Sequence, residues 1–212
     1  MNCKLALAIV TGLLMLSSPS WAQTTGPAEK TSEPPAHRFE ILPMVGYVWT
    51  GSQSATYSGS SGDVDFKSSE FYGIALEFVI MPDLQGRLLY RRQDTQLTFK
   101  QPGSQETLGD VAIEYWHLGA TGVTEMDNVV PFGSVTLGGT RYAFDGGDSW
   151  KFSMILGAGA KIYLNDRIGL MAAAEMPFTF TSAFFGAGSG GLTIGGTGIF
   201  QFDVTVGLTI RI

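Results

Sequence analysis

The chain has 212 residues, a formal net charge of −6 and a charged fraction of 15%. An acidic chain lacks the electrostatic surface that nucleic acid requires, so we expect no nucleic-acid partner. The low charged fraction and the 28 glycines depart from the composition of soluble domains, and no later apolar run reaches the roughly 18 residues of a membrane-spanning helix.

The first predicted element is a cleaved secretory signal peptide over residues 1–22. Lys4 supplies the positive charge, Leu5–Leu16 form a short apolar core, and Ser20–Ala22 provide a small-x-small cleavage site. Cys3 lies before that core, which argues against a lipid anchor, and the mature chain retains no cysteine for a disulfide. Residues 23–37 show no apolar period and are predicted to form a disordered periplasmic leader.

Apolar and polar residues then alternate in repeated segments, most clearly in 200–212, where the even positions are apolar. This period of two predicts strands. We place them at 38–50, 67–80, 84–99, 107–120, 129–143, 149–164, 168–182 and 197–212. Long connections, such as Gly51–Phe66 and Ala183–Gly196, alternate with tight ones. The pattern predicts an all-β fold over residues 38–212: an eight-stranded, antiparallel, up-and-down transmembrane β-barrel in the cell outer membrane.

The cost of placing a charge in lipid decides which strand face is turned outward. In the last strand, the opposite choice would place Asp203 in hydrocarbon and the isoleucines in the lumen. Aromatic side chains favour the headgroup level. The predicted lipid-facing girdle contains Trp49, Tyr72, Trp150, Phe152, Phe178, Phe180, Phe200 and Phe202. Tyr142 and Phe144 are expected at the same outer rim, and Phe39, Phe78, Trp116, Phe132 and Tyr163 at the inner rim.

The opposite face collects the charges, and we expect them to form a structural network that fills the lumen. Its predicted members are Glu40, Glu77, Arg87, Arg91, Asp110, Glu114, Lys151, Lys161, Glu175, Asp203 and Arg211. Counting back from the hairpin turns places Glu77 opposite Arg87 and Arg91 opposite Glu114. Closure of the barrel would bring Arg211 to Glu40. Because an eight-stranded barrel is only wide enough for side chains, no open pore is expected.

Four segments carry a family resemblance. They are Pro43–Tyr47, Phe132–Gly138, Leu156–Tyr163 followed by Asn165–Gly169, and Val206–Ile212. Over residues 38–212 the chain resembles the small outer-membrane β-barrel proteins of Gram-negative bacteria in the OmpA-, OmpW- and opacity-protein-like group. The resemblance implies an up-and-down barrel that is recognised by the barrel assembly machinery. Such barrels usually end in an aromatic residue, whereas this chain ends in Ile212.

Motifs for catalysis or cofactor binding are weak. His117 has no serine nucleophile nearby in the sequence, so no catalytic set is predicted, although distant residues could converge. The letters of 186–191 match a dinucleotide fingerprint but lack the strand–helix context that it needs. Asp63 with Asp65, and Asp145 with Asp148, each offer only two carboxylates to a cation, too few for calcium. We expect no enzyme activity, no cofactor and no metal site.

Several functions remain open. The first is a structural or surface-interaction barrel with a side-chain-filled lumen, whose partners are outer-membrane lipid and an extracellular ligand of the outer loops. The second is a binding or transport barrel for a small or apolar solute, suggested by the apolar residues in 183–198. An outer-membrane enzyme and a soluble periplasmic barrel of lipocalin type are further alternatives.

Overall fold

The structure is a computed structural model, which describes residues 38–57, 60–101, 104–124, 126, 128–144, 147–180, 193–194 and 198–212. The predicted signal peptide and leader lie outside these residues, as does most of the predicted 183–196 loop. The strands are β1 (Phe39–Thr50), β2 (Gln53–Tyr57), β3 (Ser60–Phe66), β4 (Ser69–Met81), β5 (Leu84–Gln101), β6 (Ser104–Val123), β7 (Val129–Phe144), β8 (Gly147–Tyr163), β9 (Ile168–Phe180), β10 (Thr193–Ile194) and β11 (Gly198–Arg211). Among the described residues, no helix is long and apolar enough to cross a membrane.

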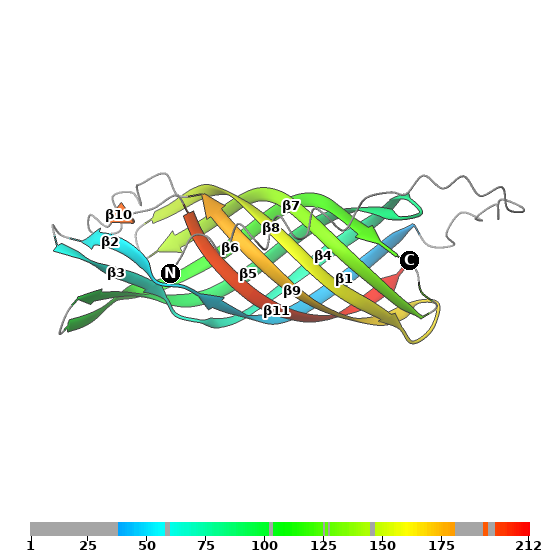
Figure 1. Cartoon of the computed structure of the whole chain (residues 1–212), viewed down its shortest axis with the longest axis horizontal. Coiled ribbons are helices and arrows are strands. Elements are labelled where there is room, and N and C mark those ends of the chain that lie inside the picture. Colours follow the sequence, from blue (N-terminus) through cyan, green and yellow to red (C-terminus); the bar gives the residue numbers. More distant parts are fainter. Residues whose placement is uncertain are drawn as a thin grey trace, which may run out of the picture. The chain divides into compact units, whose positions relative to one another are not determined.

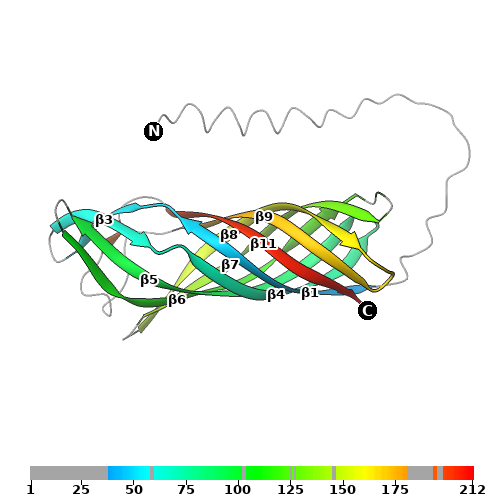
Figure 2. The same cartoon turned by 90° about the horizontal axis from the view of Figure 1, so that it is seen from below.

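Eight of these strands form a closed antiparallel barrel (Figures 1 and 2). They follow one another around the ring in the order β1, β4, β5, β6, β7, β8, β9 and β11. The ring closes where β11 pairs with β1, with Ile41 opposite Ile210. A row of paired residues that starts at Glu40 and passes once around the barrel returns to β1 near Thr50, not to Glu40. This offset requires strongly tilted strands, as closed barrels have. The predicted eight-stranded architecture is confirmed.

The alternation in the sequence becomes an alternation of burial. In β11, Val206 is 52% exposed and lies on the outer face, whereas its neighbour Thr205 is fully buried inside. The same pattern runs through β9, where every second residue from Gly169 to Thr179 is buried. Apolar side chains therefore cover the outside of the barrel, and its interior receives the polar and charged ones together with a buried apolar cluster.

The eight residues of the predicted girdle all lie on the outer face. Phe152 packs against Phe180, and Trp49 against Phe202, with ring centroids 5.5 and 5.9 Å apart. Five other aromatic residues predicted for the two rims do not belong to a lipid-facing girdle. Trp116 faces outward but packs against Tyr90 in the middle of β6. The rings that belong to the interior instead are Tyr142, Phe144, Phe132 and Tyr163.

The predicted loop over Gly51–Phe66 is largely a hairpin. β2 and β3 pair with each other, and β3 also pairs with β5, with Asp63 opposite Lys100. β10 adds a short strand next to β2. We call this extension of the sheet the arm: β2, β3, β10, residues 94–101 of β5 and residues 104–110 of β6. It projects from one end of the barrel, the arm end, at the left of Figure 1.

A β-bulge interrupts the pairing of β5 with β6. The turn pairs Gln101 with Ser104, and the same register runs to Thr98 opposite Thr107, but Leu97 then faces Gly109. One extra residue in β6, Leu108, causes the shift. Gly109 has a φ of 147°, which residues with a side chain rarely adopt. Because a bulge shifts the register by one, every residue of β6 beyond it lies on the opposite face from the one that turn counting predicts.

Candidate functional site

The charged barrel interior is the first candidate site. Near the end opposite the arm, Lys161 from β8 donates to the carboxylates of Glu40 and Glu77. Glu40 also accepts from the Tyr163 hydroxyl at 2.7 Å and from Arg211 Nε at 2.9 Å. The Lys161 side chain is fully buried. One ammonium group therefore joins β8 to β1 and β4 across the lumen.

A second group of charges lies deeper in the barrel. Arg91 Nη1 donates to Asp203 Oδ2 at 2.7 Å and approaches Glu175 Oε2 at 3.4 Å. The Arg87 guanidinium lies between this group and the first, 3.4 Å from Glu175 and 3.7 Å from Glu77. The Arg91 guanidinium also lies over the Tyr115 ring, 4.4 Å from its centroid, an arrangement that favours a cation.

These two groups form one charge-balanced network. Its acids and bases alternate in space, so each buried charge has an opposite charge beside it, as a low-dielectric interior requires. The register places Glu77 opposite Arg87 and Glu40 opposite Arg211, as the sequence predicts. The acids are Glu40, Glu77, Glu175 and Asp203, and the bases are Arg87, Arg91, Lys161 and Arg211.

Two predicted members of the network lie outside the barrel. Asp110 is exposed and accepts from the Gln96 amide at 3.1 Å. Glu114 pairs with Arg92 at 3.3 Å and with Arg141 at 3.2 Å, on the outer face. The predicted Arg91–Glu114 pair was wrong because the bulge places Tyr115 opposite Arg91. A further predicted member, Lys151, shares the inward phase of Ser153 and is half-buried.

His117 has a serine beside it that the sequence did not reveal. Its Nε2 lies 2.8 Å from Ser153 Oγ, and its Nδ1 lies 3.1 Å from Thr136 Oγ1. Ser153 also accepts from the Thr140 hydroxyl at 2.7 Å. The imidazole is 4% exposed and Ser153 is fully buried. Because a hydroxyl occupies the position of the orienting acid, and neither group reaches the surface, the pair lacks the arrangement of a catalytic triad.

Apolar side chains close the interior toward the arm end. They come from β1, from the β3 and β5 parts of the arm, and from the parts of β6, β7 and β11 nearest the arm, and all are almost completely buried. The members are Val48, Val64, Phe66, Leu97, Phe99, Val111, Ile113, Tyr142 and Ile199. These side chains form an apolar part of the interior next to the arm.

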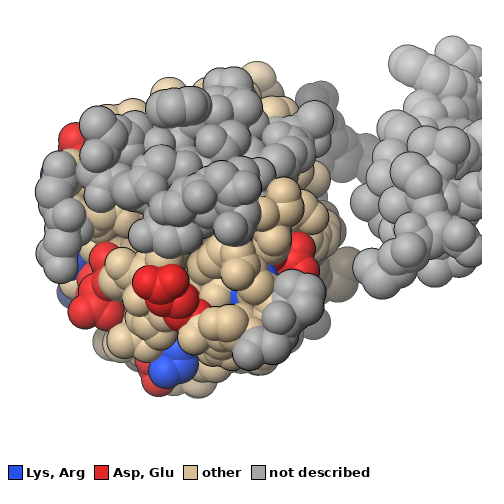
Figure 3. Space-filling model, turned by 90° about the vertical axis from the view of Figure 1, so that its left-hand side faces the viewer, with Lys and Arg blue, Asp and Glu red and all other residues tan. Residues whose placement is uncertain are grey.

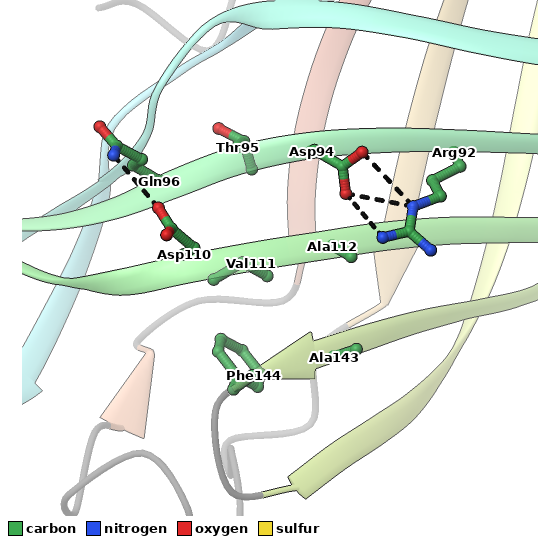
Figure 4. A pocket seen from close by; sticks show the side chains of 9 residues that line it. All are labelled: Arg92, Asp94, Thr95, Gln96, Asp110, Val111, Ala112, Ala143 and Phe144. Carbon is green, nitrogen blue, oxygen red and sulfur yellow. Dashed lines mark hydrogen bonds and ion pairs between the residues drawn. The ribbon is translucent and has the colours of Figure 1, made fainter.

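A pocket of about 510 Å³ lies where β6 separates from β7 at the base of the arm (Figure 4). β5 contributes Arg92, Asp94, Thr95 and Gln96; β6 contributes Asp110, Val111 and Ala112; and β7 contributes Ala143 and Phe144. Arg92 is held by Asp94 at 2.9 Å and by Glu114. The pocket therefore combines an apolar side with carboxylates, and its volume is that of a small-ligand site.

The carboxylates that the sequence offered as cation ligands have other partners. Burial alone would raise the pKa of Asp65, but hydrogen bonds from Lys100 and Ser52 outweigh it and lower that pKa. Asp148 accepts from Arg141 Nε at 2.8 Å. Asp145 and the glycines of 186–191 lie outside the described residues. Within the described ranges, no three His, Cys, Asp or Glu side chains are grouped in a way that could hold a metal ion.

Comparison with known proteins shows which solved structures have a similar backbone. No family model and no curated protein matches the chain. Among solved structures, the chain is similar to the outer membrane protein OprG from Pseudomonas aeruginosa, with 13% identity, a TM-score of 0.60, and coverage of 84% of this chain and 97% of that one. It is also similar to Neisserial surface protein A, with 14% identity, a TM-score of 0.56, and coverage of 82% and 97%.

A third similar structure is the outer membrane protein AlkL in lipid bilayers. The identity is 11%, the TM-score is 0.53, and the match covers 90% of this chain and 97% of that one. At such low identities the likeness concerns the backbone alone. The chain has the fold of the small outer-membrane β-barrel proteins.

Proposed function

We propose that the chain is an integral outer-membrane protein whose lumen is closed by its own side chains and whose arm is presented at the cell surface for interaction. The observation that carries this proposal is the buried charge network. Arg87, Arg91 and Lys161 are at most 1% exposed, so the bases that would line a channel are enclosed by neighbouring side chains. The apolar outer face supports residence in a bilayer.

Planar-bilayer recording of the purified, detergent-folded protein tests the closed lumen. We expect no single-channel conductance. A stable, ohmic conductance of the wild-type protein would contradict the proposal, because the buried ion pairs would then have to open in the resting state.

Cysteine labelling tests which end faces outward. The only native cysteine is Cys3, within the predicted signal peptide, so Lys100→Cys and Asp83→Cys provide single reporters at opposite ends. On intact cells, a membrane-impermeant maleimide should label Lys100→Cys on the arm but not Asp83→Cys at the tight turn. The reverse pattern would contradict presentation of the arm at the surface.

A second candidate function is binding or transport of a small or apolar solute. The observation that favours it is the pocket beside β6. There, Val111, Ala112 and Phe144 form an apolar side close to the apolar part of the interior next to the arm. Solute-dependent conductance, or solute uptake by vesicles containing the protein, would support this candidate over the first. We propose no catalytic role, since the His117–Ser153 pair is buried.

A further inference from the structure

One edge of β6 has no described partner strand over the first residues of that strand. Residues 104–123 of β6 pair with β5, but pairing with β7 begins only at Val111 opposite Phe144. Among the described residues, no strand pairs with the other edge of residues 104–110. The backbone N–H and C=O groups along such an edge are a template for a further strand.

The pocket lies at the end of this edge that is formed by Asp110. In Figure 4, β6 and β7 diverge, with Asp110 and Val111 on one side of the fork and Phe144 on the other. A strand added to residues 104–110 would be interrupted at the bulge of Leu108 and Gly109 and would point toward this fork. One of its side chains would then enter the pocket, an arrangement in which main-chain bonds provide affinity and the pocket provides selectivity.

The charge at the edge indicates which chain fits. Residues 104–110 contain Glu106 and Asp110 and no basic residue. In the described part of the protein, neither acid has a cation within ion-pair distance. The one basic residue of the pocket, Arg92, is already held by Asp94 and Glu114. Acidic side chains are also prominent on the visible surface of this end in Figure 3.

We propose that residues 104–110 of β6 bind an extended, cationic peptide segment of a partner protein as an added strand, with one basic side chain in the pocket near Asp94 and Asp110. A second copy of this chain fits poorly, because Glu106 and Asp110 would meet the same acids. The assignment rests on the proposed function, since the partner reaches this edge only if the arm is outside the cell.

The test uses a synthetic peptide that alternates lysine and threonine, and measures its binding to the detergent-folded protein by fluorescence anisotropy. The double variant Glu106→Lys/Asp110→Lys should raise Kd by about tenfold, as expected when two exposed contacts change from attraction to repulsion. The matched variant Asp83→Lys/Asp166→Lys, with the same charge change at the opposite end, should leave Kd unchanged. Gel mobility of unheated samples verifies that both variants are folded.

Two altered peptides separate strand addition from plain charge attraction. A peptide N-methylated on alternate amides should bind at least about tenfold more weakly, because it cannot complete the ladder, and one with glutamate in place of lysine should not bind. Equal binding of either peptide, or equal weakening in both double variants, would overturn the assignment. A closed, outward-labelled barrel that binds no peptide overturns this inference alone, whereas conductance or reversed labelling overturns the proposed function.

Discussion

Replacement of Lys161 by methionine should destabilise the barrel strongly. The ammonium group contacts Glu40 and Glu77 and donates to Gln85 Oε1 at 3.1 Å, and its side chain is fully buried. Removing one partner from a buried ion pair costs about 3–5 kcal/mol, because the remaining charge stays in a low-dielectric site. Here Glu40 retains Arg211 at 2.9 Å, so we expect a loss near the lower limit, about 3 kcal/mol.

Urea unfolding in lipid vesicles, followed by tryptophan fluorescence, measures the free energy of unfolding. Lys100→Met is the matched control, because it removes the same group from an ion pair with Asp65 in which the lysine side chain is 48% exposed. That control should lose less than about 1 kcal/mol. Adding Glu77→Gln to Lys161→Met should restore part of the stability, because it removes the negative charge that Lys161 no longer balances. Equal losses in Lys161→Met and Lys100→Met would refute the reasoning.

Alanine substitutions of Arg91 and Glu114 should have additive effects on the free energy of unfolding, because the bulge places the two side chains on opposite faces; a coupling above about 0.5 kcal/mol in a double-mutant cycle would contradict this register. Gly109→Ala should cost about 1–3 kcal/mol in urea unfolding, whereas Gly147→Ala should cost less; in both, an added Cβ meets open space, but only Gly109 has a positive φ. The carboxyl of Asp65 should titrate below its ordinary pKa in a carbon-13 NMR experiment. Since its folded pKa is lowered, its contribution to stability is present at neutral pH and is lost as the pH falls through that pKa. An Asp65 pKa at or above the ordinary value would contradict the Lys100 pair.

The sequence was sufficient to predict the barrel and the outward face of most strands. The reason is energetic, since a strand such as β11 can turn Asp203 only away from hydrocarbon. Glu77 was also correctly placed opposite Arg87. The turn alone does not fix this pair, because the register of β4 with β5 shifts between Val79 and Met81. The choice of outward face depends on the cost of burying single residues, which the sequence alone supplies.

The bulge in β6 could not be predicted in this way. Counting from the turn correctly paired the residues nearest to it, as Gln101 with Ser104 shows, but nothing in the alternation marks Leu108 as an extra residue. A single insertion then moved Asp110 and Glu114 to the outer face. A glycine within the strand, Gly109, was the one local signal, because bulges favour it.

The arm hairpin was missed for a different reason. Its serines and glycines suggested a loop, yet Val64 and Phe66 alternate with Asp63, Asp65 and Lys67, and this short period of two could have predicted β3.

The His117–Ser153 pair could not be found from local spacing. The two residues lie on β6 and β8, with β7 between them. They meet only because a narrow barrel brings the inward side chains of several strands together.

The neutralisation of the lumen depends on contacts between strands that are far apart in the sequence. Arg211 reaches Glu40 across 171 positions of sequence, and Asp203 reaches Arg91 across 112. A sheet that entered the bilayer before β11 reached β1 would lack these ion pairs, and each charge left unpaired would cost several kcal/mol. Closure of the barrel between β1 and β11 and its entry into hydrocarbon are therefore expected to occur together.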